Sequence, residues 1–154
     1  QAEDGIRDDW LRLVGSEMCI RDRDILQLIG ELRVVCDQLE GDDELQAVGS
    51  AVRSGLGQLE EGLNWLASNA MSNPHGAGAA SVNMLMLAGV TIGGAILAKA
   101  TLAAKAAGED ASFMSDKIAT LRFYCSHVLP RAHGYRAAAT ADPEETMAIA
   151  ADRL

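Results

Sequence analysis

The sequence is poor in aromatic residues and in proline, and this scarcity narrows the fold class. Aromatic side chains make up only 4% of the 154 residues and prolines number three, whereas hydrophobic residues reach 49%. A core with so few rings is built from Ala, Leu, Val, Ile and Met, a composition that favours helices. A chain of this length is also long enough for one domain and too short for two. We therefore expect a single all-helical domain.

Positive charge is scarce as well. Thirteen basic residues stand against 22 acidic ones, which gives a net charge of −9. Such a surface repels the phosphate backbone of nucleic acids and anionic lipid headgroups. We therefore expect neither nucleic acid nor a membrane among the partners.

Cysteines are few, and their spacing matches no common disulfide or metal-binding motif. Cys19, Cys36 and Cys125 are odd in number and far apart, with no C-x-x-C pair and no signal-peptide pattern before them. Each is expected to be a small apolar residue in a reduced protein. The expected location is the cytoplasm.

Two amphipathic helices are predicted in the first half. Their apolar residues recur at three- and four-residue spacings, which place them on one helix face. The first stripe comprises Ile25, Leu28, Ile29, Leu32, Val35, Cys36 and Leu39, and the second comprises Leu45, Val48, Val52, Leu56, Leu59, Leu63, Leu66 and Ala70. Gly41 ends the first helix, and Asp42, Asp43 and Glu44 favour the start of the next. The spacing predicts near-antiparallel packing, and Gly49, Gly55, Gly57 and Gly62 are expected to allow close approach of a neighbouring helix.

The segment 72–76 is predicted to form a turn that leaves His75 solvated in a loop. The stretch that follows, 76–98, contains no charged residue and has two interpretations. One is a membrane span that dimerises through Gly89 and Gly93, which match the G-x-x-x-G pattern. The other is the central helix of a soluble bundle, apolar on nearly every side. We favour the bundle, because Asn83 lies within the stretch, Lys99 and Lys105 follow it on the same helix, and two amphipathic helices need a partner.

A fourth helix follows a junction at 108–112. Its apolar face comprises Met114, Ile118, Leu121, Cys125, Val128 and Ala132. Pro130 has no N–H for the carbonyl of Ser126, so this helix is expected to kink there. Asp142 and Pro143 have the pattern of a helix start, which predicts a short helix through about Ala150. The expected fold is an all-α antiparallel four-helix bundle with a kinked last helix and a short C-terminal helix.

Cys125, His127 and His133 are crowded around Pro130, and they are the candidates for chemistry. Zinc needs at least three converging ligands, whereas His127 points about 200° around the helix from Cys125, and His133 lies beyond the proline. No acid is placed to orient either histidine. We therefore expect no catalytic, cofactor-binding or metal site. A surface formed by Arg122, Arg131 and Arg136 is interpreted as solvated or as ion-paired with the acidic first half.

The C-terminal third resembles a known family. Bacterial acyl-CoA dehydrogenases with an extra C-terminal helical domain often end in K-x-x-T-A-R-F-Y/F-x-x-H-x-L-P-x-A and a tail like G/A-x-E-x-x-M-A-L. The matching residues here are Lys117, Thr120, Arg122, Phe123, Tyr124, His127, Leu129, Pro130, Ala132, Glu145, Met147 and Ala148. The chain is similar in particular to the 3-methylmercaptopropionyl-CoA dehydrogenase branch. It departs from the pattern at Leu121 and at Asp142-Pro143.

The resemblance extends loosely to about Asp24 and has functional implications. It implies a parent flavoprotein of fatty acid metabolism that dehydrogenates an acyl-CoA thioester, a glutamate taking the proton and FAD the hydride. No segment here supplies that base, a flavin-facing β-domain or a phosphate loop. The implied role is a structural domain over residues 24–154, a fragment with no FAD of its own. Its implied partners are the parent catalytic core and its homo-oligomer, with acyl-CoA bound through the parent.

The first 23 residues are expected not to belong to this domain. Residues 14–23 resemble a translated sequencing-adapter run, as seen at the edges of reading frames assembled from environmental DNA. We therefore expect residues 1–23 to form a non-native or disordered leader.

Overall fold

The structure is a computed structural model that describes residues 24–142, 144–145, 148–149 and 153. Five α-helices and no strand occur within these residues. The helices are residues 24–40, α2 (Gln46–Asn69), α3 (Pro74–Ala107), α4 (Ala111–His127) and α5 (Arg131–Ala139). The predicted all-helical class is confirmed.

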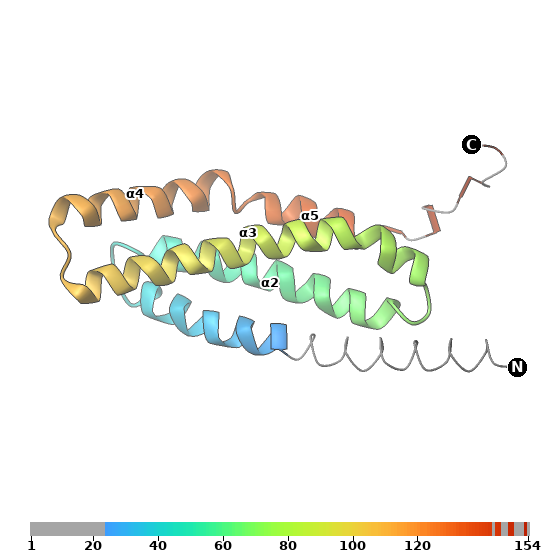
Figure 1. The fold of residues 1–154 in the computed structure, drawn as a ribbon, viewed down its shortest axis with the longest axis horizontal. Coiled ribbons are helices and arrows are strands. Elements are labelled where there is room, and N and C mark those ends of the chain that lie inside the picture. The colour runs from blue at the N-terminus through green and yellow to red at the C-terminus, as the bar shows by residue number, and fades with distance from the viewer. Residues whose placement is uncertain (1–23, 143, 146–147, 150–152, 154) are drawn as a thin grey trace, which may run out of the picture.

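The helices form an antiparallel bundle whose fourth arm is split in two. The helix 24–40 and α3 run in one direction and α2 runs in the other (Figure 1). Helices α4 and α5 follow one another along α3, so that α4 lies beside its C-terminal half and α5 beside its N-terminal half. The longest helix, α3, thus contributes to the packing along the whole bundle.

Local sequence sets the helix ends. Gly108 closes α3 with a φ of 71°, and the side chain of Asp110 accepts hydrogen bonds from the backbone N–H groups of Ser112 and Phe113 at the start of α4. At the start of α3, Asn73 Oδ1 accepts from the N–H of Gly76 at 2.8 Å. The helix therefore already begins at Pro74. The prediction of a turn through residue 76 was too long, and His75 lies exposed on the first helical turn rather than in a loop.

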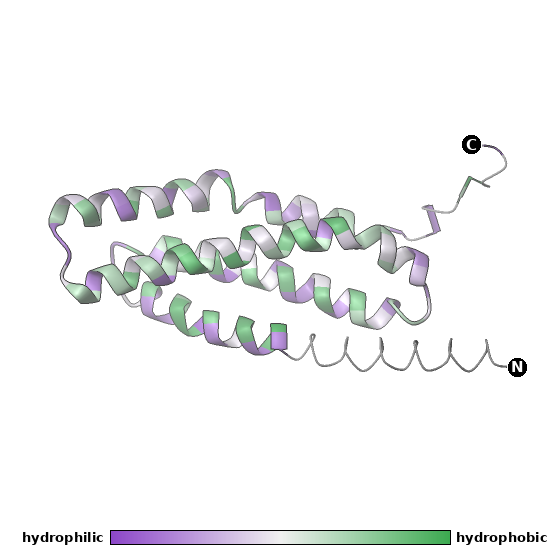
Figure 2. Ribbon diagram, viewed as in Figure 1, coloured by the Kyte–Doolittle hydropathy of each residue, from purple (hydrophilic) through white to green (hydrophobic). Residues whose placement is uncertain are grey.

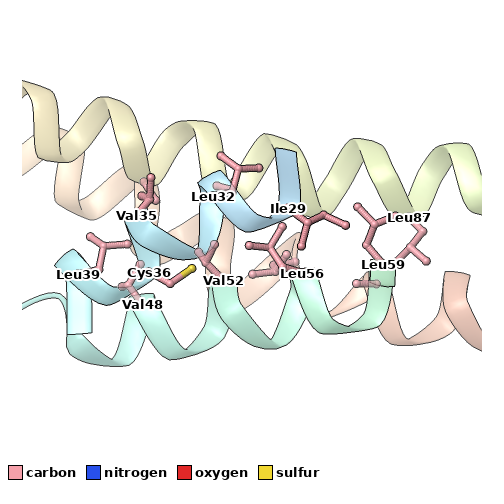
Figure 3. Close-up of a cluster of buried hydrophobic side chains, with 14 of the residues drawn as sticks. Ile29, Leu32, Val35, Cys36, Leu39, Val48, Val52, Leu56, Leu59 and Leu87 are labelled. Carbon is pink, nitrogen blue, oxygen red and sulfur yellow. The ribbon is translucent and has the colours of Figure 1, made fainter. Parts of the chain in front are cut away.

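The buried core follows the two predicted stripes of the first half. Figure 3 shows side chains of helix 24–40 and α2 meeting each other and Leu87 of α3. The fully or nearly fully buried members are Ile29, Leu32, Val35, Cys36, Leu39, Leu45, Val48, Val52, Leu56, Leu59 and Leu87. Burial of this many aliphatic side chains is the main stabilising contribution, because the aromatic rings in the described part of the chain are at most partly buried.

Three of the four glycines within α2 lie at close helix contacts. A Cβ on Gly49 would lie 2.9 Å from Leu39 Cβ, one on Gly55 would lie 2.8 Å from Leu129 Cδ1, and one on Gly62 would lie 2.9 Å from Met84 Sδ. The expected close approach is confirmed at these positions. It was wrong for Gly57, which has no atom within 4 Å of the same position because it lies on an open part of the helix surface.

The predicted kink at Pro130 is a complete break between α4 and α5. The N–H groups of Val128 and Leu129 both bond to the carbonyl of Tyr124, and the chain turns through Pro130 into α5. Because the turn rotates the chain, Leu129 is buried and Val128 only partly so, which corrects the predicted face. Asp142 Oδ1 accepts from the N–H of Glu144 as expected. The described half of the predicted C-terminal helix is a 3₁₀ turn at 144–145 and a bend at 148–149 rather than an α-helix, and the other half lies outside the described residues.

Candidate functional site

The break at Pro130 borders a small cavity, which contains two of the three residues considered for chemistry. The cavity, about 140 Å³, lies between α2 and the α4–α5 turn and is lined by Ser54, Gly55, Cys125, Leu129, Pro130, Ala132, His133 and Ala51. His127 is not among the lining residues. Its ring lies beside the exposed ring of Phe123, with the two centroids 4.7 Å apart.

The cavity has little capacity for chemistry. Burial raises the pKa of the Cys125 thiol to about 11, so the thiol is protonated near neutral pH and is a poor nucleophile or metal ligand. Over residues 24–142 and the few described beyond them, no three His, Cys, Asp or Glu side chains come close enough to hold a metal ion. The structure thus places Cys125 and His133 at one cavity, and no hydrogen bond joins these two side chains.

Two of the three arginines around the break, Arg122 and Arg136, make ion pairs with the acidic first half, as one of the two interpretations predicted, whereas Arg131 is exposed and has no ion-pair partner among the described residues. Arg122 Nη2 lies 3.4 Å from Glu44 Oε1 and donates to the backbone carbonyl of Glu44. Arg136 Nε donates to Gln58 Oε1 at 2.7 Å and lies 3.5 Å from Glu61 Oε2. These contacts fix the fourth arm against α2 and its preceding turn. We therefore assign them a structural role.

A second ionic cluster joins helix 24–40 to α2. Arg53 donates to Glu40 at 2.9 Å and to Asp37 at 2.5 Å. The hydrogen bond from Arg53 holds the pKa of Glu40 below its ordinary value, and a hydrogen bond from Lys105 does the same to the pKa of Asp42. Charged side chains therefore stabilise the contacts between helices at this end of the bundle.

The outer face of α3 is the most unusual surface of the molecule. Val82 is 68% exposed, Leu85 73% and Ile96 56%, although this face carries no charge between Gly76 and Ala98. Figure 2 shows the apolar colouring of this helix continuing along the bundle. As the sequence indicates, α3 is apolar on nearly every side, but it does not lie at the centre of the bundle, because the three other arms in the described part of the chain leave one of its faces bare.

By length and composition, α3 is also apolar enough to cross a membrane, as core helices of soluble proteins sometimes are. Within its most apolar 18-residue stretch, 33% of the residues are buried. The two glycines of the G-x-x-x-G pattern have different surroundings. Gly89 has no atom within 4 Å of a would-be Cβ, whereas at Gly93 the Tyr124 hydroxyl lies 2.8 Å away. That hydroxyl donates to the Val90 carbonyl at 3.0 Å. Gly93 is therefore used inside the bundle, which weighs against membrane dimerisation through this pair.

Comparison with protein families gives the decisive observation. A family model described as acetyl-CoA dehydrogenase C-terminal like matches residues 28–150. The chain belongs to this family. The match begins within the first described helix and extends past α5, so this acyl-CoA dehydrogenase C-terminal domain includes all four arms of the bundle. Neither the curated proteins nor the solved structures that were compared gave a match.

Proposed function

We propose that this domain is a structural and interface part of an FAD-dependent acyl-CoA dehydrogenase and is not catalytic on its own. In that proposal the parent enzyme removes hydrogens from the α and β carbons of an acyl-CoA thioester, with a glutamate as base and FAD as hydride acceptor. Both groups belong to the parent core. The domain covers that core or a subunit interface within the homo-oligomer.

The observation that carries the proposal is the bare outer face of α3 in a member of this family. Large exposed aliphatic side chains on one continuous helix face are typical of surfaces that pack against protein. Leu85 and Val82 project there without any charged neighbour on the same helix face. A domain whose function is packing needs such a surface, and it needs no reactive side chain.

The cavity at Pro130 supports the same proposal. Its cysteine is held protonated by burial, and its histidine is exposed at the rim. General acid–base or nucleophilic catalysis needs a group whose pKa lies near the working pH or a base that activates it. Neither condition is met by Cys125. We accordingly assign proton and hydride transfer to the parent core.

The finer assignments follow the resemblance of the C-terminal motif. We propose the 3-methylmercaptopropionyl-CoA dehydrogenase branch on the resemblance of the sequence alone; the motif residues from Lys117 to Ala132 lie on α4, the turn and α5. We propose a cytoplasmic enzyme of acyl-CoA metabolism as the setting, consistent with the acidic chain and its free Cys36 and Cys125. No flavin is proposed to bind to this chain.

Two measurements test the proposal. Reading the source DNA upstream of the codon for Asp24 should reveal an in-frame dehydrogenase core, and a frame that encodes an unrelated protein would contradict the assignment. The purified chain should show no visible flavin absorbance and no acyl-CoA-dependent reduction of an electron-accepting dye. Tightly bound flavin, or turnover by this chain alone, would overturn the non-catalytic role. Recovery of the chain only in the membrane fraction would favour the membrane span instead.

A further inference from the structure

The exposed face of α3 has a regular pattern that indicates what covers it. Its residues recur at spacings of four, three, four, three and four, and we call this set the outer seam: Gly78, Val82, Leu85, Gly89, Ile92 and Ile96. Ile92 is half-buried and the other five are exposed. This spacing is typical of a helix that packs lengthwise against another helix. The inner face of α3 already packs against the bundle, so the outer seam is a second packing face on the same helix.

The seam is also self-complementary in size. If two copies of α3 run antiparallel about a two-fold axis level with Leu87, each seam residue lies opposite another seam residue of the second copy. Leu85 then lies opposite Gly89, Ile96 opposite Gly78, and Ile92 opposite Val82. Each glycine receives a large aliphatic side chain, and each such contact occurs twice because a two-fold interface is isologous. A parallel pair would instead place Gly89 against Gly89 and leave a gap.

Charge limits where two copies of the chain can meet. The chain carries a net charge of −9, so two copies repel each other over most of their surfaces. The outer seam lies within the 23 residues from Gly76 to Ala98 that carry no charge. Contact there buries apolar surface without burying a charge. Self-association through any charged face would lack this advantage.

We propose that two copies of this domain dimerise through the outer seam of α3, antiparallel and about a two-fold axis. The inference rests on the proposed function for its setting, since it identifies the subunit interface to which the domain contributes. It differs from pairing through Gly89 and Gly93, because Gly93 lies under Tyr124 and outside the seam.

The first test is the mass of the purified chain in solution. Sedimentation velocity over a range of concentrations should show a monomer–dimer equilibrium for the natural sequence. In Leu85→Glu, a carboxylate would be buried opposite Gly89 of the second copy, which should weaken dimerisation by about a hundredfold or more. Met71→Glu is the matched control, because Met71 is 92% exposed in the turn between α2 and α3 and lies off the seam. This control should dimerise like the natural chain.

A size exchange tests the antiparallel register. Leu85→Gly opens a gap and Gly89→Leu places two leucines in one layer, so each single variant should weaken the dimer. The double variant restores one leucine and one glycine in each layer and should recover most of the affinity. Its composition equals that of the natural helix, so intrinsic helix propensity changes little. Far-UV circular dichroism should show the same helix content in all four proteins.

Several results would overturn the inference. These are a monomer at every concentration, a dimer that tolerates Leu85→Glu, and a double variant no better than its single variants. Association seen only with added lipid vesicles would indicate a membrane instead. None of these results bears on the flavin and turnover measurements, so failure of the dimer is distinguishable from failure of the proposed function.

Discussion

The two long faces of α3 are built from similar residues, yet they have different surroundings. On the inner face Leu87, Ala95 and Ala98 are fully buried against the other helices. On the outer face Leu85 and Ile96 are equally apolar and stay exposed. The difference shows that hydrophobicity alone does not say which face of a helix forms the core. What decides is whether another arm of the same bundle reaches that face, and the three other arms formed by the described residues do not.

The largest expected effect separates the two faces directly. Leu87→Ala removes a fully buried side chain and should lower the free energy of unfolding by about 3 kcal/mol. Leu85→Ala, two residues away, should change it by less than about 0.5 kcal/mol in dilute protein. Urea unfolding followed by circular dichroism measures both. Equal losses in the two variants would show that both faces are buried in the folded monomer.

A second pair of variants compares the glycines of the same two faces. Gly93→Ala would push against the Tyr124 hydroxyl and should destabilise the domain by roughly 1–2 kcal/mol, since overpacking outweighs the gain in helix propensity. Gly89→Ala meets open space and should stabilise it by up to about 1 kcal/mol. Thermal unfolding should move in opposite directions for the two. A shift of the same sign would mean that Tyr124 does not cover Gly93.

Tyr124 links α4 to the inner face of α3, and loss of its hydroxyl should have a smaller effect on stability. Tyr124→Phe loses the hydrogen bond to the Val90 carbonyl and should cost about 1 kcal/mol. The same change should reduce the penalty of Gly93→Ala, because the atom nearest to the new methyl group is gone. Tyr135→Phe, on α5, is the control. Additive effects at Gly93 and Tyr124 would contradict the contact.

The smallest expected effect on stability comes from the ion pairs between helices. The outer face of α3 between Gly76 and Ala98 has no charged residue to form such pairs. Arg53 keeps the pKa of Glu40 below its ordinary 4.5, and Lys105 keeps the pKa of Asp42 below 3.8. A carboxylate with a depressed pKa stabilises the fold above the unfolded-state pKa and loses this contribution as the pH falls through the folded-state pKa. Stability should therefore decline as the pH falls below about 4.5.

A variant isolates this acid sensitivity. Arg53→Met should be less stable than the natural chain at neutral pH and should lose less on acidification, because Glu40 then titrates near its ordinary pKa. Arg131→Met is the control, because Arg131 makes no ion pair with any residue in the described part of the chain. Denaturant midpoints across the acid range provide the measurement. An unchanged slope in Arg53→Met would refute the role of this ion pair.

The sequence predicts the helices and their core-facing sides well, because helical periodicity and helix-capping residues depend only on nearby residues. Stripes such as Ile29 to Leu39 follow the helical repeat, and Gly108 and Asp110 mark a helix end and a helix start without reference to the rest of the fold. Whether a given glycine lies at a contact between helices cannot be predicted from nearby residues. Gly57 and Gly49 look alike in the sequence, and only the position of Leu39 distinguishes them.

The bare face of α3 could not be anticipated from the same reasoning. An uncharged stretch fits a helix buried on all sides as well as one with two separate apolar faces, and the three-and-four spacing of Val82, Leu85 and Gly89 is compatible with both. The register after Pro130 was missed for a related reason. Because of the turn, Leu129 rather than Val128 lies in the core. The rotation of the chain at this turn depends on the tertiary contact of Leu129 with Gly55.

The two buried threonines of α3 have a consequence for how this domain tolerates change. Thr91 and Thr101 donate their hydroxyls to the carbonyls of Leu87 and Leu97 on their own helix. Each hydroxyl therefore has its hydrogen-bond partner on its own helix, so neither threonine fixes the position of one arm along another. Among the fully buried residues, alignment of the arms thus depends on steric fit, which is tightest at the glycines, whereas the hydrogen bonds and ion pairs between arms lie nearer the surface. Swaps among aliphatic residues of equal volume should be accepted widely there, whereas one extra methyl group at Gly49 should not.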